Sequence, residues 1–229
     1  MKAPQRIIIN GMNWADIVEV AKADAKPVTG ELFQYWPKYT HLVKTSRNRG
    51  QIDFKPFEIV RPSGISWVVR FRSCNYADFK RRGLVYLLYG LFHYRGGLFV
   101  INTFVPNEYR PGVAYDYMIY TPHFFERYRE RYLKDDTTPI KDVINYFFKY
   151  NSVGGLNKFY SENNATRPVG EFGTMEHGAA LGQWEHGVFI AKTFISSELF
   201  FIQQQEHYKT AIAEIQDYNN RTIYNYNNG

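Results

Sequence analysis

The fold class is decided by residues 84–105, which read LVYLLYGLFHYRGGLFVINTFV. Two apolar runs rich in aromatic and β-branched residues flank Arg95-Gly96-Gly97, and glycine at such a point favours the tight turn of a β-hairpin. Residues 65–72 before this hairpin and residues 113–120 after it are also strand-like. Four candidate strands in succession predict an antiparallel sheet.

Helix signals surround these strands. Asn13 is a suitable N-cap, and Thr121 followed by Pro122 combines a capping side chain with a proline at the first helical position. Thr138-Pro139 repeats this device before an amphipathic segment. The expected helices are 13–24, 122–134, 139–150 and 197–216. The sequence therefore predicts an α+β fold, a mostly antiparallel sheet with flanking helices.

The remaining segments lack strong periodicity. Lys26-Pro27 should end the first helix, and residues 31–64 are expected to form loops or short strands because prolines and glycines interrupt them. Residues 156–175 are polar and rich in glycine and asparagine, which predicts a loop. A second β-hairpin is expected within 177–196, and residues 217–229 form a frayed tail.

The size and composition of the chain favour one domain over residues 1–229. A subdivision into a basic strand-rich part, 1–120, and an α+β part, 121–220, is the alternative. Cys74 is the single cysteine, so no intrachain disulfide forms. No apolar run reaches the roughly 20 residues of a membrane helix, and no signal peptide is evident. These features predict a cytoplasmic protein without a membrane partner.

Positive charge is concentrated in one segment. Residues 38–82 hold eleven Lys or Arg against three Asp or Glu, a net +8, whereas the whole chain carries +6. Aromatic residues interleave with these cations, a pattern typical of single-stranded nucleic-acid binding. A solvated basic face without a partner is the alternative. The candidate nucleic-acid ligands are Lys44, Arg47, Arg49, Arg70, Arg72, Lys80, Arg81, Arg82 and Lys192.

Three side chains predict a chemical site on the helix 122–134. His123, Arg127 and Arg131 are spaced i, i+4 and i+8, so an α-helix places them on one face. The positive end of the helix dipole favours a neutral imidazole, and two guanidinium groups can hold a phosphate. Cleavage of RNA needs such an acid or base beside fixed cations. The alternative is a surface helix on which Glu126 and Glu130 pair with these cations.

The strand 187–195 supplies a further candidate. Alternation places Thr193 on the opposite face from Lys192, and Thr193 matters for chemistry only if it faces the helix of His123. The alternative is that Thr193 only contributes its preference for β-strands. Glu176-His177 and Glu185-His186 contain residue types that bind metals, but no helical zinc motif is present. We expect no metal and no cofactor.

The stretch TPHFFERYRERYL, residues 121–133, resembles the opening H-x-x-x-R-x-x-x-R helix of RelE-like toxins. These toxins belong to the metal-independent RNases of the barnase, colicin and RelE type. VFIAKTFIS, residues 188–196, is similar to their last strand, which often ends in Thr or Ser. The resemblance covers 121–196 and implies RNA cleavage with His123, Arg127 and Thr193 at matching positions. It also implies Arg131 and Lys192 as supporting cations and an antitoxin as a candidate partner.

Two functions follow from these observations. The first is an RNA-directed nuclease or toxin-like protein that cleaves RNA by metal-independent acid and base chemistry. The alternative is a non-enzymatic nucleic-acid-associated or phage structural protein, located in the virion if a phage encodes it. The stretch 121–133 also resembles uncharacterised proteins of gut Bacteroidetes and their phages. This second resemblance implies no function.

Overall fold

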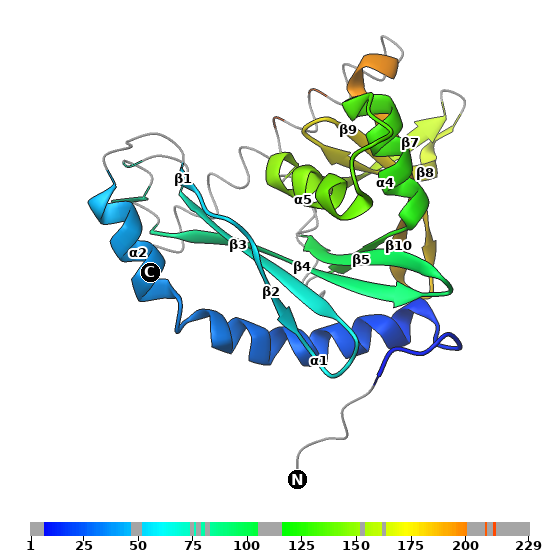
Figure 1. Ribbon diagram of the computed structural model, residues 1–229. Coiled ribbons are helices and arrows are strands. Elements are labelled where there is room, and N and C mark those ends of the chain that lie inside the picture. The colour runs from blue at the N-terminus through cyan, green and yellow to red at the C-terminus, as the bar shows by residue number, and fades with distance from the viewer. Residues whose placement is uncertain are drawn as a thin grey trace. The chain divides into compact units, whose positions relative to one another are not determined.

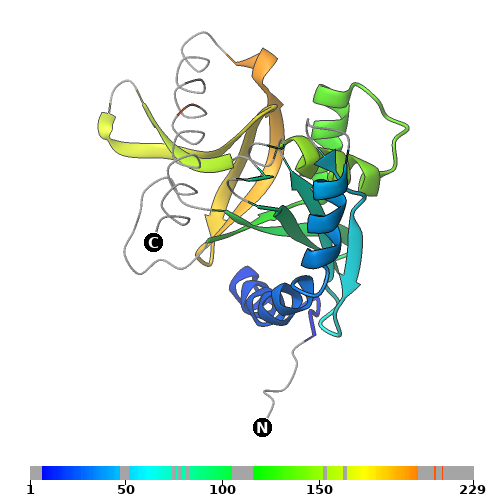
Figure 2. The same ribbon diagram turned by 90° about the vertical axis from the view of Figure 1, so that its left-hand side faces the viewer.

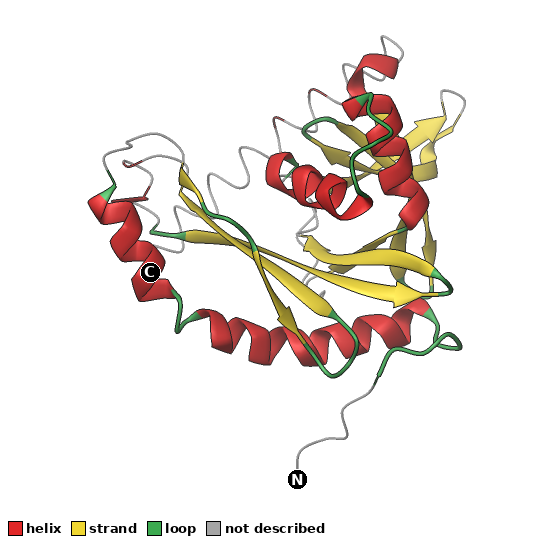
Figure 3. Cartoon of the chain, viewed as in Figure 1, coloured by secondary structure: helices red, strands yellow, loops and turns green. Residues whose placement is uncertain are grey.

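The computed structural model describes residues 7–46, 52–73, 76, 79–80, 83–104, 116–151, 154–161, 164–200, 209 and 213. The chain divides into two compact units, unit 1 (Met1–Asn102) and unit 2 (Thr103–Gly229). The boundary between the units follows Asn102, whereas the alternative subdivision predicts it after residue 120. Helices and mostly antiparallel strands occur in both units, which confirms the predicted α+β class (Figure 3).

The strands of unit 1 form an antiparallel arrangement around one long hairpin (Figure 1). Arg95 and Gly96 occupy its turn with φ of 47° and 78°, the left-handed conformations that a two-residue hairpin turn requires. The predicted hairpin at 84–105 is thus confirmed. Two short strands, β1 and β2, both pair with β3. The strands are β1 (Ile52–Asp53), β2 (Phe57–Val60), β3 (Ser66–Ser73), β4 (Val85–Tyr94) and β5 (Gly97–Phe104).

Two helices complete unit 1, α1 (Trp14–Leu32) and α2 (Trp36–Thr45). Asn13 caps α1 by accepting a hydrogen bond of 3.0 Å from the Asp16 amide. The predicted end at Lys26-Pro27 is wrong, because Val28 and Leu32 are buried and their packing offsets the hydrogen bond that a proline removes. The prediction of loops or short strands over residues 31–64 is also wrong for residues 36–45, because they form the helix α2. Pro37 lies in its first turn, where proline begins a helix instead of breaking it.

The core of unit 1 lies between these helices and the strands. Leu32 of α1 and Val43 of α2 pack with Val69 and Phe71 of β3. Rings of α2 extend this core, and the centroid of the Trp36 ring lies 5.9 Å from that of Phe71. The aromatic residues of this part of the chain therefore serve largely as packing.

The strands of unit 2 follow the order β6-β10-β9-β8-β7. β6 and β10 are parallel, and the other neighbours are antiparallel. The predicted hairpin within 177–196 is confirmed, with His186 and Gly187 in its turn at φ of 52° and 76°. The loop predicted at 156–175 is wrong, because pairing with neighbouring strands overrides a weak local preference. The strands are β6 (Asp116–Tyr120), β7 (Gly154–Ser161), β8 (Asn164–Met175), β9 (Gly178–Glu185) and β10 (Val188–Ser196).

The helices of unit 2 are α4 (Pro122–Tyr128), a π-helical turn η1 (Arg129–Leu133) and α5 (Ile140–Tyr150). Thr121 caps α4 as predicted, because its Oγ1 accepts a hydrogen bond of 3.3 Å from the Phe124 amide. The predicted cap at Thr138 is wrong. Its hydroxyl bonds to Asp135, and α5 begins after Pro139 without a side-chain cap.

In unit 2, α4 lies beside β10 (Figure 2), and aromatic packing joins the two elements. The Phe194 ring is fully buried and lies 5.9 Å from Phe124 and 4.9 Å from Tyr128, centroid to centroid. A short 3-10 turn, η2 (Ser197–Leu199), follows β10. The rest of the predicted helix 197–216 lies outside the described residues, apart from Phe200, Lys209 and Ala213, of which the last two are helical. The predicted tail 217–229 also lies outside them.

None of the helices in the described ranges is both long enough and apolar enough to cross a membrane.

Candidate functional site

His123 and Arg127 lie together on the exposed side of α4. Arg127 Nε donates a hydrogen bond of 3.3 Å to His123 Nε2. His123 Nδ1 is 3.3 Å from a Glu126 carboxylate oxygen, and Arg127 Nη1 pairs with Glu130. The His123 side chain is 53% exposed. The structure therefore brings His123 and Arg127 together, within the carboxylate pairs that the surface-helix alternative predicted.

Arg131 makes a different contact from His123 and Arg127. It lies in the π-helical turn η1, and its Nη1 donates a hydrogen bond of 2.6 Å to the Phe194 carbonyl of β10. Arg131 therefore joins η1 to β10, whereas Arg127 contacts His123 and Glu130. That the three side chains act together on a phosphate stays a prediction.

Thr193 lies on the other side of the strands of unit 2. It is paired in register with Leu181, whereas its neighbour Phe194 packs against α4. Because successive side chains alternate between faces, Thr193 points away from α4 and from His123. A β-bulge between Ala191 and Thr193 interrupts the alternation used in the sequence prediction.

Lys192 occupies this bulge and remains exposed. Its Nζ is 2.9 Å from a Glu185 carboxylate oxygen on β9. Thr121 Oγ1 donates a hydrogen bond of 3.3 Å to the Lys192 carbonyl, so the start of α4 contacts the bulge through the backbone.

The candidate nucleic-acid ligands of unit 1 differ in exposure. Lys44 is exposed in the last turn of α2, and the exposed Lys80 lies over the Tyr76 ring at 5.1 Å from its centroid. Arg70 is buried and pairs with Asp53 at 2.7 Å, so its assignment as a nucleic-acid ligand is corrected to a structural ion pair. Arg72 is half-buried. The candidates outside the described residues are Arg47, Arg49, Arg81 and Arg82.

The aromatic residues expected to stack on bases in unit 1 are largely core residues. The Tyr39 ring lies 4.5 Å from Phe71 and 4.8 Å from Phe54, centroid to centroid. Phe71 and Phe79 are buried, and Tyr76 packs against the same core. The interpretation of these rings as a stacking surface is therefore corrected.

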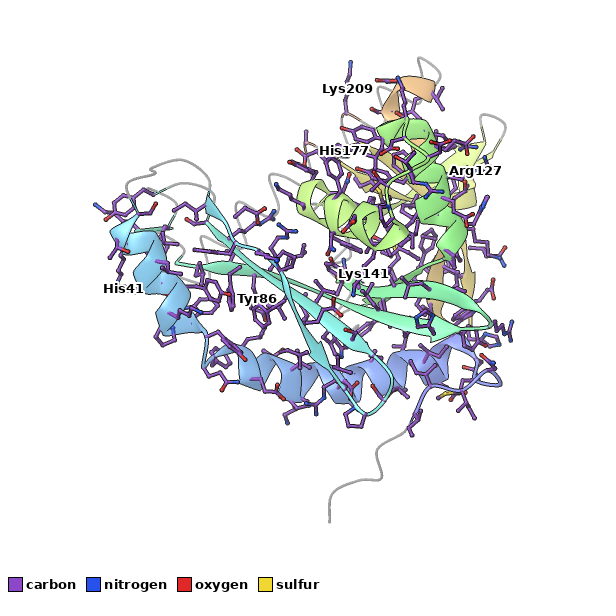
Figure 4. All side chains as sticks on the ribbon, in the orientation of Figure 1. His41, Tyr86, Arg127, Lys141, His177 and Lys209 are labelled. Carbon is purple, nitrogen blue, oxygen red and sulfur yellow. The ribbon has the colours of Figure 1, made fainter. Side chains whose placement is uncertain are left out.

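A second site in unit 2 surrounds His177, and we call it the tyrosine–histidine cluster: Tyr128, Tyr132, Tyr146, Tyr150 and His177 (His177 is labelled in Figure 4). The Tyr128 hydroxyl is 2.7 Å from His177 Nδ1. The Tyr132 ring stacks on the imidazole at 3.9 Å between centroids and 12° between planes. Residues from η1, α4, α5 and the start of β9 thus meet at one imidazole.

Asn151 determines which ring nitrogen of His177 carries hydrogen. Its Oδ1 accepts a hydrogen bond of 2.9 Å from the His177 amide, and its Nδ2 donates one of 3.0 Å to the Phe147 carbonyl. These two bonds fix the amide orientation, which places a donor 3.2 Å from His177 Nδ1. Nδ1 therefore accepts hydrogen bonds from Asn151 and Tyr128, and the hydrogen of the neutral ring lies on Nε2.

Burial favours the uncharged forms of three side chains of the cluster. It lowers the pKa of His177 below the ordinary 6.5. Burial also raises the pKa of Tyr128 and of Tyr132, and for Tyr132 the neighbouring tyrosines and the carboxylates of Glu176 and Glu198 add to this rise. His177, Tyr128 and Tyr132 consequently favour their neutral forms.

Sequence reasoning considered His177 only as a metal ligand. His177 and His186 flank β9 at its opposite ends, so the hairpin does not bring these two histidines together. Across the described ranges, no group of three or more His, Cys, Asp or Glu is arranged to hold a metal ion. The available signal was the i, i+4 spacing of tyrosines on two helices, 128 with 132 and 146 with 150.

No protein-family model matches the chain, and neither a curated protein nor a solved structure does so. The functional interpretation therefore depends on the geometry and charge of the chain's own residues.

Proposed function

We propose that the chain binds nucleic acid, with RNA favoured, and that unit 1 contacts the phosphate backbone. The observation that carries this proposal is the asymmetry of charge between the units. Unit 1 holds sixteen Lys or Arg against seven Asp or Glu, a net +9, and unit 2 holds twelve against fifteen, a net −3. A concentrated positive charge attracts a polyanion and releases its counterions on binding.

Two exposed lysines of unit 1 are suitable phosphate contacts. Lys44 stands at the end of α2, and Lys80 is held over a tyrosine ring. Arg70 has no part in this proposal, because its guanidinium group is paired with Asp53. The four arginines outside the described residues remain candidates on charge alone.

The binding test uses the full chain and a fluorescein-labelled single-stranded RNA in an anisotropy titration. We expect the double variant Lys44→Ala, Lys80→Ala to bind more weakly than the wild type. Lys22→Ala is the matched control, because Lys22 lies outside 38–82 and pairs with Glu19 at 2.8 Å. The proposal fails if the wild type does not bind, or if the control loses as much affinity as the double variant.

Metal-independent RNA cleavage is a second candidate function, favoured by the contact of His123 with Arg127. In this hypothesis His123 acts as acid or base, and Arg127 stabilises the charge of the phosphate. Arg131 is bonded to the backbone of β10, and Thr193 faces away from α4, so the hypothesis depends on two residues. RNA is incubated with wild type and with His123→Ala in the presence of a chelator. Loss of cleavage in the variant alone supports the hypothesis, whereas equal cleavage or none rejects it.

A further inference from the structure

We propose that the tyrosine–histidine cluster binds an unpaired base of single-stranded nucleic acid. The base would stack on a tyrosine ring and accept a hydrogen bond from His177 Nε2. This inference rests on the proposed function and adds a base-binding surface in unit 2, distinct from the phosphate contacts of unit 1. Its ligand is a neutral aromatic ring with acceptor atoms on its edge.

Two tyrosines of α5 provide the stacking surface. Tyr146 and Tyr150 are each 38% exposed, although most large rings of unit 2 are buried. Their ring centroids are 4.5 Å apart, and the Tyr150 ring lies 6.0 Å from the imidazole of His177 at 27°. A base can stack on any accessible aromatic face, so exposed rings beside an ordered imidazole form a suitable surface.

His177 adds a hydrogen-bond donor of fixed direction. Tyr128 and Asn151 hold Nδ1 as an acceptor, which places the ring hydrogen on Nε2. In the described part of the chain, the hydrogen bonds of this imidazole are made at Nδ1, which leaves Nε2 as the donor that the proposed base would meet. Unpaired bases expose carbonyl oxygens and ring nitrogens that accept such a bond.

The charges around the cluster suit a neutral ligand. Glu176 and Glu198 act on Tyr132 and disfavour a phosphate beside it, whereas Lys149 Nζ lies over the Tyr150 ring at 5.0 Å from its centroid. A neutral ring is compatible with both charges, and acceptor atoms on its edge match the donor at Nε2.

Three variants of the full chain test this inference with the labelled single-stranded RNA. Tyr150→Ala removes the ring, Tyr150→Phe keeps it, and Trp184→Ala removes another exposed ring of unit 2 as the matched control. Loss of one stacked base weakens binding by about 5- to 150-fold. We expect this loss for Tyr150→Ala and near wild-type binding for Tyr150→Phe and Trp184→Ala. Circular dichroism establishes that each variant is folded.

The salt dependence of binding separates this site from unit 1. Tyr150→Ala should weaken binding without changing the slope of log Kd against log salt, because stacking releases no counterions. Neutralising a phosphate-binding lysine should reduce that slope by about 0.7. Wild-type binding that Tyr150→Ala leaves intact, or an equal loss in Trp184→Ala, overturns this inference alone. Absence of wild-type binding overturns the proposed function as well.

Discussion

Substitution of Asn151 by aspartate changes one atom of the side chain that controls the protonation of His177. In the wild type an amide donor lies 3.2 Å from His177 Nδ1, and burial holds the pKa of His177 below 6.5. Asn151→Asp places a carboxylate oxygen at that distance. An opposite charge this close raises the pKa of a base by about 1–3 units. We therefore expect the pKa of His177 to rise above its ordinary value.

The two proteins should then differ in how stability depends on pH. In the wild type the unfolded chain binds the proton more tightly, so stability falls as pH decreases from about 6.5 through the lowered pKa. In Asn151→Asp the folded chain binds the proton more tightly, so stability is greatest below about 6.5 and falls as pH rises through the raised pKa. We expect a difference of about 1–2 kcal/mol, since His177 is half-buried and water screens the pair.

An NMR titration of the imidazole resonances gives the pKa of His177 in both proteins, with the other histidines as internal references. Urea unfolding at pH 5.5 and pH 8 measures the change in stability. A pKa of His177 that is unchanged or lower in Asn151→Asp would refute the contact between residue 151 and His177 Nδ1. A variant whose stability still rises with pH would refute the expected reversal of the pH dependence.

Three stability predictions follow from the packing of each unit, all measured by urea unfolding. Phe194→Ala should lower the free energy of unfolding by about 3–5 kcal/mol, because this buried ring packs against α4; a loss below 1 kcal/mol would contradict that packing. Ser63→Ala removes the hydrogen bond to buried Asp24 and should cost about 1–3 kcal/mol; full wild-type stability would show that the bond contributes nothing. Gly90→Ala places a methyl group 2.7 Å and 2.9 Å from two isoleucine side chains and should lower the free energy of unfolding by about 1–3 kcal/mol. A variant more stable than the wild type would contradict this close packing.

Local signals predicted most of the fold because they depend on few residues. Gly96 permits the turn of the hairpin. The start of α4 is set by the hydroxyl of Thr121, which caps it, and by the ring of Pro122, which favours the first helical position. Pro27 misled because buried neighbours offset its missing hydrogen bond in α1. The strands β7 and β8 were missed because their pairing partners, not their composition, determine their structure.

The candidate site was less predictable than the fold. His123 and Arg127 meet as their helical spacing predicted, but Arg131 bonds to the backbone of β10, and Thr193 faces away from α4 after a β-bulge. Neither arrangement has a signal within the motif itself. The tyrosine–histidine cluster depends on contacts between residues 26 and 49 positions apart, which periodicity does not report.

The affinity of the full chain for single-stranded RNA, measured across a salt series, tests the central claim most directly. The account predicts binding at low salt that weakens steadily as salt rises, with a log–log slope of at least about 1.4 for two phosphate contacts. Affinity that does not change with salt, or no binding at about 50 mM salt, would contradict a role for the positive charge of unit 1.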